Sequence, residues 1–104
     1  MSSDHTFDYR SLDETIHARP RLAIISFLIA LKEADFNTLK RTLLLTDGVL
    51  SVHLRKLEEA GFIRVTKAFV NRKPRSRYAL TKRGQIAFEK YLDQIEKLVK
   101  TQPL

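Results

Sequence analysis

The apolar residues of this chain change their spacing at Gly61, from the period of a helix to the pattern of strands. Before this glycine, Leu50, Leu54 and Leu57 recur three or four residues apart and fall within about 60° of one another on a helix. Gly61 itself lies where a helix needs a left-handed C-terminal residue. The segment after it, Phe62 to Val70, is rich in β-branched and aromatic residues. We therefore expect a helix that passes directly into extended structure.

The extended structure is predicted to be a two-stranded hairpin. Asn71 to Arg75 is the expected turn, with Pro74 inside it, and Ser76 to Leu80 alternates between two faces as a return strand does. Thr81 can cap a final helix, which covers residues 82–100.

Three more helices are expected upstream. The run Ser11 to Glu14 matches a capping box and predicts a short helix to about His17. Pro20 suits the first turn of a new, mostly apolar helix, which we interpret as the central core helix. Asp35 to Asn37 can cap a third helix, and Thr46 can cap the helix that ends at the glycine.

These elements together predict a winged helix-turn-helix. Two short helices meet across the brief linker Leu43 to Thr46, and a hairpin follows them. The expected fold is mainly α with a small β-hairpin (α+β), with about five helices and a two- to three-stranded antiparallel wing. We expect residues 1–10 to be a flexible N-terminal tail and residues 11–100 to be a single domain.

The basic residues are concentrated in the hairpin segment. None of the twelve Asp and Glu lies between residues 61 and 88, whereas eight of the nineteen Lys and Arg do: Arg64, Lys67, Arg72, Lys73, Arg75, Arg77, Lys82 and Arg83. A basic run is often only a solvated face. Its position directly behind an amphipathic helix favours a polyanionic partner, with double-stranded DNA as the best match.

Several function classes are not supported by the sequence. The absence of cysteine excludes disulfides and thiolate metal sites, and the three histidines have no metal-binding spacing, so we expect no metal and no cofactor. No catalytic motif occurs, and we expect no enzymatic activity. The apolar run Leu22 to Leu31 is too short to span a bilayer and the start does not match a signal peptide, so we expect a cytoplasmic protein with no membrane partner.

Two stretches of the sequence resemble a known family. They run from Leu45 to Ile63 and from Lys73 to Gly84, and they are similar to the winged-helix transcriptional regulators of bacteria and archaea, in a small subgroup near the MarR and ArsR families. The similarity extends over about Leu12 to Leu98. It implies a homodimer joined through the terminal helices, with one recognition helix per subunit and no enzymatic activity.

The candidate DNA-contacting residues fall in three groups. Arg55 can form two hydrogen bonds to a guanine, Ser51 or Thr46 can bind a phosphate or a base, and Val52 can contact a thymine methyl. The full set on the recognition helix is Thr46, Asp47, Gly48, Ser51, Val52, Arg55 and Lys56. Phosphate or minor-groove candidates in the wing are Arg72, Lys73, Arg75 and Arg77, and weaker supporting candidates are Lys40, Arg41 and Lys67.

An apolar stripe on the last helix has two possible partners, the rest of its own domain or the same helix in a second copy. Its residues are Phe88, Tyr91, Leu92, Ile95, Leu98 and Val99, to which we add Leu12 and Ile16 as a candidate dimer interface. A symmetric dimer is expected to read a palindromic operator, and a repressor is the favoured role. No pattern identifies a small-molecule effector.

Two alternative functions remain at this stage. The same fold can be a protein-interaction module with nonspecific or no DNA binding, and an acidic partner would then meet the basic wing. RNA binding lacks support because we expect the hairpin aromatics, Phe69 and Tyr78, to lie in the core rather than to be exposed for stacking.

Overall fold

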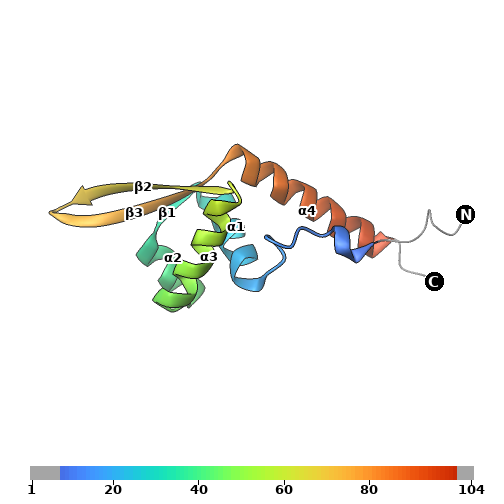
Figure 1. Cartoon of the computed structure of the whole chain (residues 1–104), viewed down its shortest axis with the longest axis horizontal. Coiled ribbons are helices and arrows are strands. Elements are labelled where there is room, and N and C mark those ends of the chain that lie inside the picture. The colour runs from blue at the N-terminus through green and yellow to red at the C-terminus, as the bar shows by residue number, and fades with distance from the viewer. Residues whose placement is uncertain (1–7, 101–104) are drawn as a thin grey trace, which may run out of the picture.

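Residues 8–100 are described by the computed structural model, and within that range the backbone forms four α-helices and one antiparallel sheet (Figure 1). A short 3-10 helix at Tyr9–Ser11 comes first. The elements that follow are α1 (Arg19–Leu31), β1 (Glu33–Asp35), α2 (Phe36–Leu43), α3 (Asp47–Glu59), β2 (Ile63–Val70), β3 (Lys73–Leu80) and α4 (Lys82–Lys100). The expected α+β architecture, mainly helical with an antiparallel wing, is confirmed. Most of the expected N-terminal tail, residues 1–7, lies outside the described residues.

Polar side chains cap the two short helices where the sequence predicts them. Asp35 is the N-cap of α2, and its Oδ1 accepts a hydrogen bond of 2.8 Å from the Thr38 N–H. Thr46 is the N-cap of α3, and its Oγ1 accepts a bond of 3.2 Å from the Val49 N–H. Pro20 lies in the first turn of α1, where backbone N–H groups have no acceptor within the helix, so the lack of an N–H in proline costs no hydrogen bond. The helix-turn-helix is therefore built from local capping chemistry.

The segment before α1 is not the helix that the capping box predicts. Residues 14–16 form a turn, and Asp13 Oδ1, not the Ser11 hydroxyl, accepts a hydrogen bond of 3.0 Å from the Ile16 N–H. A helix this short is unfavourable to nucleate, and α1 begins only three residues later, at Arg19. Because Ile16 is fully buried, tertiary packing holds the segment in place. The described residues thus have four α-helices where about five were expected.

The core is centred on side chains from α1 and one face of α3, and α2, β2 and α4 add further buried residues. Ile24, Ile25 and Leu28 of α1 are at most 1% exposed, as are Leu50 and Leu57 of α3. The helical periodicity of α3 therefore buries its leucine face and leaves the opposite face in solvent.

The sheet contains three strands, within the two to three that were expected, although the sequence pattern does not locate the third. β1 pairs antiparallel with β3, so the strand order is β1-β3-β2. Three residues are too few to show a strand periodicity, and only the central Ala34 is buried. β1 pairs with positions 77–79 of β3, so the outer part of the hairpin extends beyond it (Figure 1).

The hairpin turn is shorter than predicted, and the proline is not in it. Asn71 and Arg72 form a two-residue turn with φ values of 53° and 66°, as the tightest hairpins require. Pro74 lies in β3, opposite Phe69. Hydrogen-bonded and non-hydrogen-bonded pairs alternate along an antiparallel ladder, and the pair next to a two-residue turn is hydrogen-bonded. The second pair, Phe69 and Pro74, is therefore non-hydrogen-bonded and needs no N–H from the proline.

The start of α4 packs tightly against the end of α3. Thr81 Oγ1 accepts a bond of 3.0 Å from the Gly84 N–H and donates one of 2.6 Å to the Gly61 carbonyl, which confirms its capping role. A Cβ on Gly84 would lie 2.1 Å from the Phe62 carbonyl oxygen, so only glycine fits there. From this junction α4 runs away from the hairpin to the opposite end of the molecule (Figure 1). No helix within residues 8–100 is long and apolar enough to cross a membrane.

Candidate nucleic-acid interface

A groove of about 240 Å³ separates α3 from the base of the hairpin. Helix α3 contributes Ser51, Leu54, Arg55 and Glu58 to its lining, and the strands contribute Val65, Lys67 and Tyr78. The candidate readers on α3 therefore share one surface with the wing. Lys67, which the sequence supports only weakly, lies on that surface.

The exposed side of α3 carries the predicted recognition residues. Ser51, Arg55 and Lys56 are exposed, and Val52 is 47% exposed. A Cβ on Gly48 would meet no atom within 4 Å, so this glycine leaves open space at the start of the helix and is not required by the packing. The helix therefore presents hydroxyl, guanidinium and methyl groups together, which is the chemistry that reads base edges in the major groove.

The hairpin has two faces because side chains alternate along each strand. We call the face toward α3 the inner face. It carries Val65, Lys67, Phe69, Pro74, Ser76 and Tyr78. The outer face carries Thr66, Ala68, Val70, Lys73, Arg75 and Arg77.

Two of the predicted wing cations are paired with acids of β1. Arg77 Nη2 lies 2.9 Å from Glu33 Oε1, and Arg75 Nη1 lies 4.0 Å from Asp35 Oδ2. Both arginines are on the outer face, away from α3. Their charges are therefore partly compensated, and among the predicted wing cations and Lys67, only Lys67 lines the groove beside α3, whereas Arg72 lies at the hairpin turn.

Asp35 joins this ion pair to the start of α2. The Thr38 N–H and hydroxyl groups lower the pKa of the Asp35 carboxyl most strongly, burial opposes that effect, and Arg75 and Arg77 lower the pKa further. The carboxylate therefore stays ionised, where it serves both as a helix cap and as a partner for the wing arginines.

A salt bridge joins the two helices of the helix-turn-helix. Lys40 Nζ in α2 lies 2.8 Å from Asp47 Oδ1 at the start of α3. Lys40, a weak phosphate candidate, is thus engaged within the protein, whereas Arg41 beside it is exposed. Asp47 is the first residue of α3, where a carboxylate is favoured by the helix dipole.

Arg21 fastens the back of α3 to α1, a contact for which the sequence offers no signal. Its Nη1 lies 2.9 Å from His53 Nδ1, and its Nε donates to the Thr15 carbonyl. Because a guanidinium only donates, His53 Nδ1 must accept, and the imidazole is neutral. Burial lowers the pKa of His53 most, and the charges of Arg21 and Lys56 lower it further.

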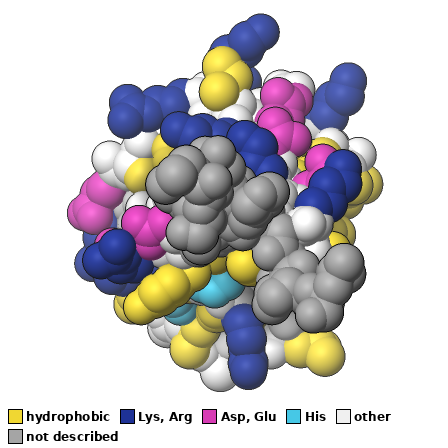
Figure 2. Space-filling view, turned by 90° about the vertical axis from the view of Figure 1, so that its right-hand side faces the viewer, with side chains coloured by type: hydrophobic (Ala, Val, Ile, Leu, Met, Phe, Trp, Pro, Cys, Tyr) yellow, Lys and Arg dark blue, Asp and Glu magenta, His cyan; other side chains and the backbone are white. Residues whose placement is uncertain are grey.

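The predicted dimer-interface residues divide between the core and the surface. Phe88, Tyr91 and Ile16 are buried within the protomer, at 8%, 4% and 0% exposure. Leu92 and Val99 are 49% and 65% exposed, and the remaining members are partly buried: Leu12, Ile95 and Leu98. Figure 2 views the end of the molecule at which α4 finishes, and it shows hydrophobic side chains gathered around a histidine there.

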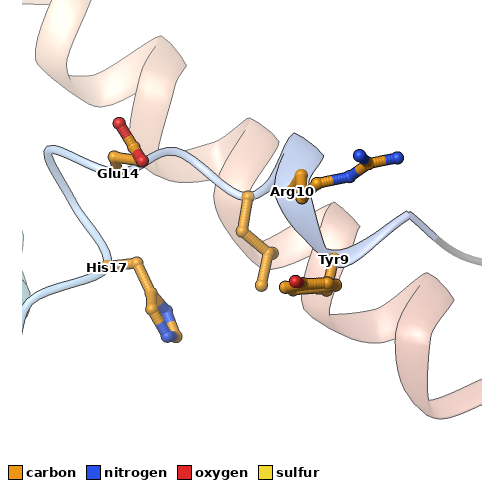
Figure 3. Close-up of a pocket in the computed structure, with 5 residues that line it drawn as sticks. Tyr9, Arg10, Glu14 and His17 are labelled. Carbon is orange, nitrogen blue, oxygen red and sulfur yellow. The ribbon is translucent and has the colours of Figure 1, made fainter.

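A shallow pocket of about 530 Å³ lies beside that surface, in the N-terminal segment (Figure 3). Its lining is Tyr9, Arg10, Leu12, Glu14 and His17. The His17 Nδ1 is 2.6 Å from the Tyr91 hydroxyl, which ties the segment to α4. Arg10 is paired with Asp8 at 2.9 Å. No group of residues within the described part of the chain could hold a metal ion.

The hairpin aromatics are not both in the core, contrary to the sequence-based prediction. Tyr78 is partly buried against the core, but Phe69 is 77% exposed. Phe69 lies beyond the part of the hairpin that β1 and α3 support, so no element covers it. Strand composition alone does not show how far a hairpin extends past the core.

Comparisons with known proteins identify the family of this chain and structures of similar fold. A family model described as a winged helix DNA-binding domain matches residues 20–99. An uncharacterized protein of Methanocaldococcus jannaschii is 39% identical over 80 residues, which cover 77% of this chain and 87% of that protein. The solved structure of a transcriptional regulator homologue from Pyrococcus horikoshii has a TM-score of 0.81 at 27% identity, covering 88% of this chain and 91% of that one.

Two structures from named regulator families share the fold at lower identity. A MarR-family regulator from Silicibacter pomeroyi has a TM-score of 0.63 at 17% identity, covering 88% of this chain and 59% of that one. An ArsR-family regulator has a TM-score of 0.59 at 19% identity, covering 94% of this chain and 100% of that one. At these identities the likeness concerns the fold alone.

Proposed function

This chain belongs to the winged helix DNA-binding domain family, and from that premise we propose that it is a transcriptional regulator that binds double-stranded DNA through α3 and the hairpin. The observation that carries the proposal is the groove in which Ser51 and Arg55 of α3 lie beside Lys67 of the wing. Base-reading groups and a phosphate-binding cation on one exposed surface suit a DNA groove and its backbone.

In the proposed complex, α3 lies in the major groove. Arg55 reads a guanine with its two-pronged guanidinium, Val52 contacts a thymine methyl, and Ser51 or Thr46 binds a phosphate or a base. Asp47 and Gly48 set the start of the helix, and Lys56 adds charge on the exposed side. The Lys40–Asp47 salt bridge holds α2 against α3 as α2 crosses the backbone, beside Arg41.

The wing in this complex contacts phosphates chiefly through Lys67, Arg72 and Lys73. Arg75 and Arg77 contribute less because Asp35 and Glu33 partly compensate their charges. This order differs from the sequence-based prediction, which placed Lys67 among the weaker supporting candidates, together with Lys40 and Arg41.

We further propose a homodimer that forms through the distal part of α4. Leu92 and Val99 expose apolar surface there, beside the partly buried Leu12 and Ile95. Residues 11–100 would act as one DNA-binding unit with α4 as its dimerisation helix. A symmetric pair presents two α3 helices to an inverted repeat, and by covering a promoter it would act as a repressor.

Selection of bound fragments from random duplex DNA tests the proposal. We expect an enriched inverted repeat, because two symmetry-related helices reach half-sites about 34–36 Å apart. Uniform recovery would indicate a nonspecific binder, and failure to recover DNA at any salt concentration would refute DNA binding.

Arg55→Ala tests which residue reads the bases. We expect relaxed preference at one base pair and a binding loss of about 1–3 kcal/mol on the selected site. Lys90→Ala is the matched control, since it removes the same charge from an exposed position on α4. Equal losses on every sequence would remove Arg55 from base reading.

A further inference from the structure

An exposed aromatic residue faces the same side as α3, near the tip of the wing. Phe69 is 77% exposed and pairs with Pro74 across the hairpin. Both belong to the inner face, which also carries Lys67. Phe69 thus holds a large apolar side chain in solvent within a basic segment, on the side of the hairpin that faces α3.

The inner face presents its residues in a defined order, moving out from α3. Val65 and Tyr78 line the groove with Arg55, Lys67 comes next, and Phe69 follows. Four residues of strand put Phe69 about 13 Å beyond Val65. A helix with its side chains is about 10–12 Å across and fills a major groove about 12 Å wide.

This order matches the order of features on a duplex. With α3 in the major groove, Lys67 falls at the phosphate strand that borders the groove, and Phe69 falls past that strand, at the neighbouring minor groove. Arg72 and Lys73, near the turn, then lie where phosphates on the far side of the minor groove can bind them.

The hairpin holds Phe69 in a restricted geometry. The two-residue turn at Asn71 and Arg72 fixes the register, and a non-hydrogen-bonded pair brings its side chains close together. The ring of Pro74 therefore stands directly across the ladder from Phe69. Such an apolar pair has the chemistry of the Phe and Pro wedges that part stacked bases.

We propose that Phe69, backed by Pro74, inserts as an apolar wedge at a base step in the minor groove and bends the bound DNA. The inference rests on the proposed DNA binding and adds a deformation to it. Steps that unstack easily, such as TA and CA, are the expected sites, and they add sequence preference where no base edge is read.

The test uses a short duplex from the random-DNA selection, labelled at its two ends with a donor and an acceptor fluorophore. Wild-type protein should raise energy transfer, because a kink shortens the distance between the ends. Phe69→Ala should bind about tenfold or more weakly with little rise in energy transfer, and Phe69→Leu should keep part of the bend because leucine is also a wedge residue.

Val70→Ala is the matched control. Val70 is the neighbouring residue on the outer face, 48% exposed, and its truncation should leave binding and bending unchanged. The salt dependence of binding should be the same for Phe69→Ala as for wild type, because no charge is lost. Melting temperatures of the variants show that each is folded.

Other outcomes separate the wedge from the proposed function. Binding of the duplex by wild type without any bend, or equal bending by Phe69→Ala, overturns the wedge and leaves DNA binding intact. If Phe69→Ala weakens the binding of single-stranded DNA but not of the duplex, the wedge is overturned in favour of base stacking. If Phe69→Ala instead changes the oligomeric mass of the protein, the wedge is overturned in favour of a protein contact. No binding of any duplex refutes both proposals.

Discussion

Leu44, in the turn between α2 and α3, adopts a backbone conformation that is unfavourable for its side chain. Its φ is 56°, in the left-handed region, and its side chain is 89% exposed. Leu44→Gly removes the steric cost of that conformation without losing buried surface. We expect a gain of about 0.5–1 kcal/mol in the free energy of unfolding, measured by urea denaturation.

The control for this substitution is Arg41→Gly, at an exposed position inside α2. Glycine at position 41 should lower the free energy of unfolding by about 1 kcal/mol, because a residue inside a helix does not need the wider range of backbone angles that glycine allows. A destabilising Leu44→Gly would show that the leucine makes a contact that its exposure conceals.

His53 predicts a pH dependence of stability. Burial, Arg21 and Lys56 hold its pKa below the ordinary value of 6.5, so the unfolded chain binds a proton at higher pH than the folded one. The stability that neutral His53 provides is therefore fully present above about pH 6.5 and declines as the pH falls toward the folded pKa.

His53→Gln should remove that decline while still offering Arg21 an acceptor oxygen. The comparison is the free energy of unfolding of both proteins across this pH range. The other histidines are common to both, so the difference isolates His53. If the free energy of unfolding changed with pH in the same way in both proteins, His53 would not be the source of the decline.

At the scale of the element, the two faces of the hairpin have different electrostatic environments. Lys67 faces the groove beside Arg55, whereas Arg77 faces away and is paired with Glu33. Lys67→Ala should weaken binding to all DNA sequences and lower the salt slope by about one unit per subunit. Arg77→Ala removes the same charge from the outer face and should change the slope much less.

Titration of DNA at several salt concentrations measures both variants. Wild type is expected to show a slope of about −6 if each dimer neutralises six to eight phosphates. Equal changes for the two variants would mean that net charge, not the facing of the hairpin, controls binding. A flat response for wild type would contradict the electrostatic contribution altogether.

At the scale of the whole molecule, the hairpin of the proposed DNA surface and the distal end of α4, the proposed dimer surface, lie at opposite ends (Figure 1). Leu92 and Val99 expose apolar area on distal α4, and the double variant Leu92→Lys, Val99→Lys should halve the mass measured by light scattering. Binding to an inverted repeat should weaken sharply, because the two half-sites are no longer joined.

The control is Ile86→Lys, which alters an equally exposed residue, at 55%, near the start of α4. It should leave the mass unchanged. A monomeric wild-type protein at micromolar concentration would contradict the proposed dimer and would leave the DNA-binding surface of each protomer to act alone.

Local chemistry made much of the fold predictable. The caps Asp35, Thr46 and Thr81 each act on the amide three residues away, and Gly61 has the positive φ that its position demands. The leucine face of α3 follows from a spacing of three to four residues. Such features depend on neighbours in the chain, so the sequence displays them. Membership of the winged-helix regulators, inferred from the residues around α3 and β3, is confirmed by the family match.

The sequence by itself determined the capped starts of α2, α3 and α4 and the basic hairpin that follows α3, and it favours a polyanionic partner. Only the tertiary structure decided which charges are available to that partner, because Glu33 and Arg77 are brought together by strand pairing and not by any local pattern. The same holds for the exposure of Phe69, which depends on how far the hairpin extends past the core. Spacing along the chain encodes the elements, whereas contacts between distant elements set which of their side chains remain free.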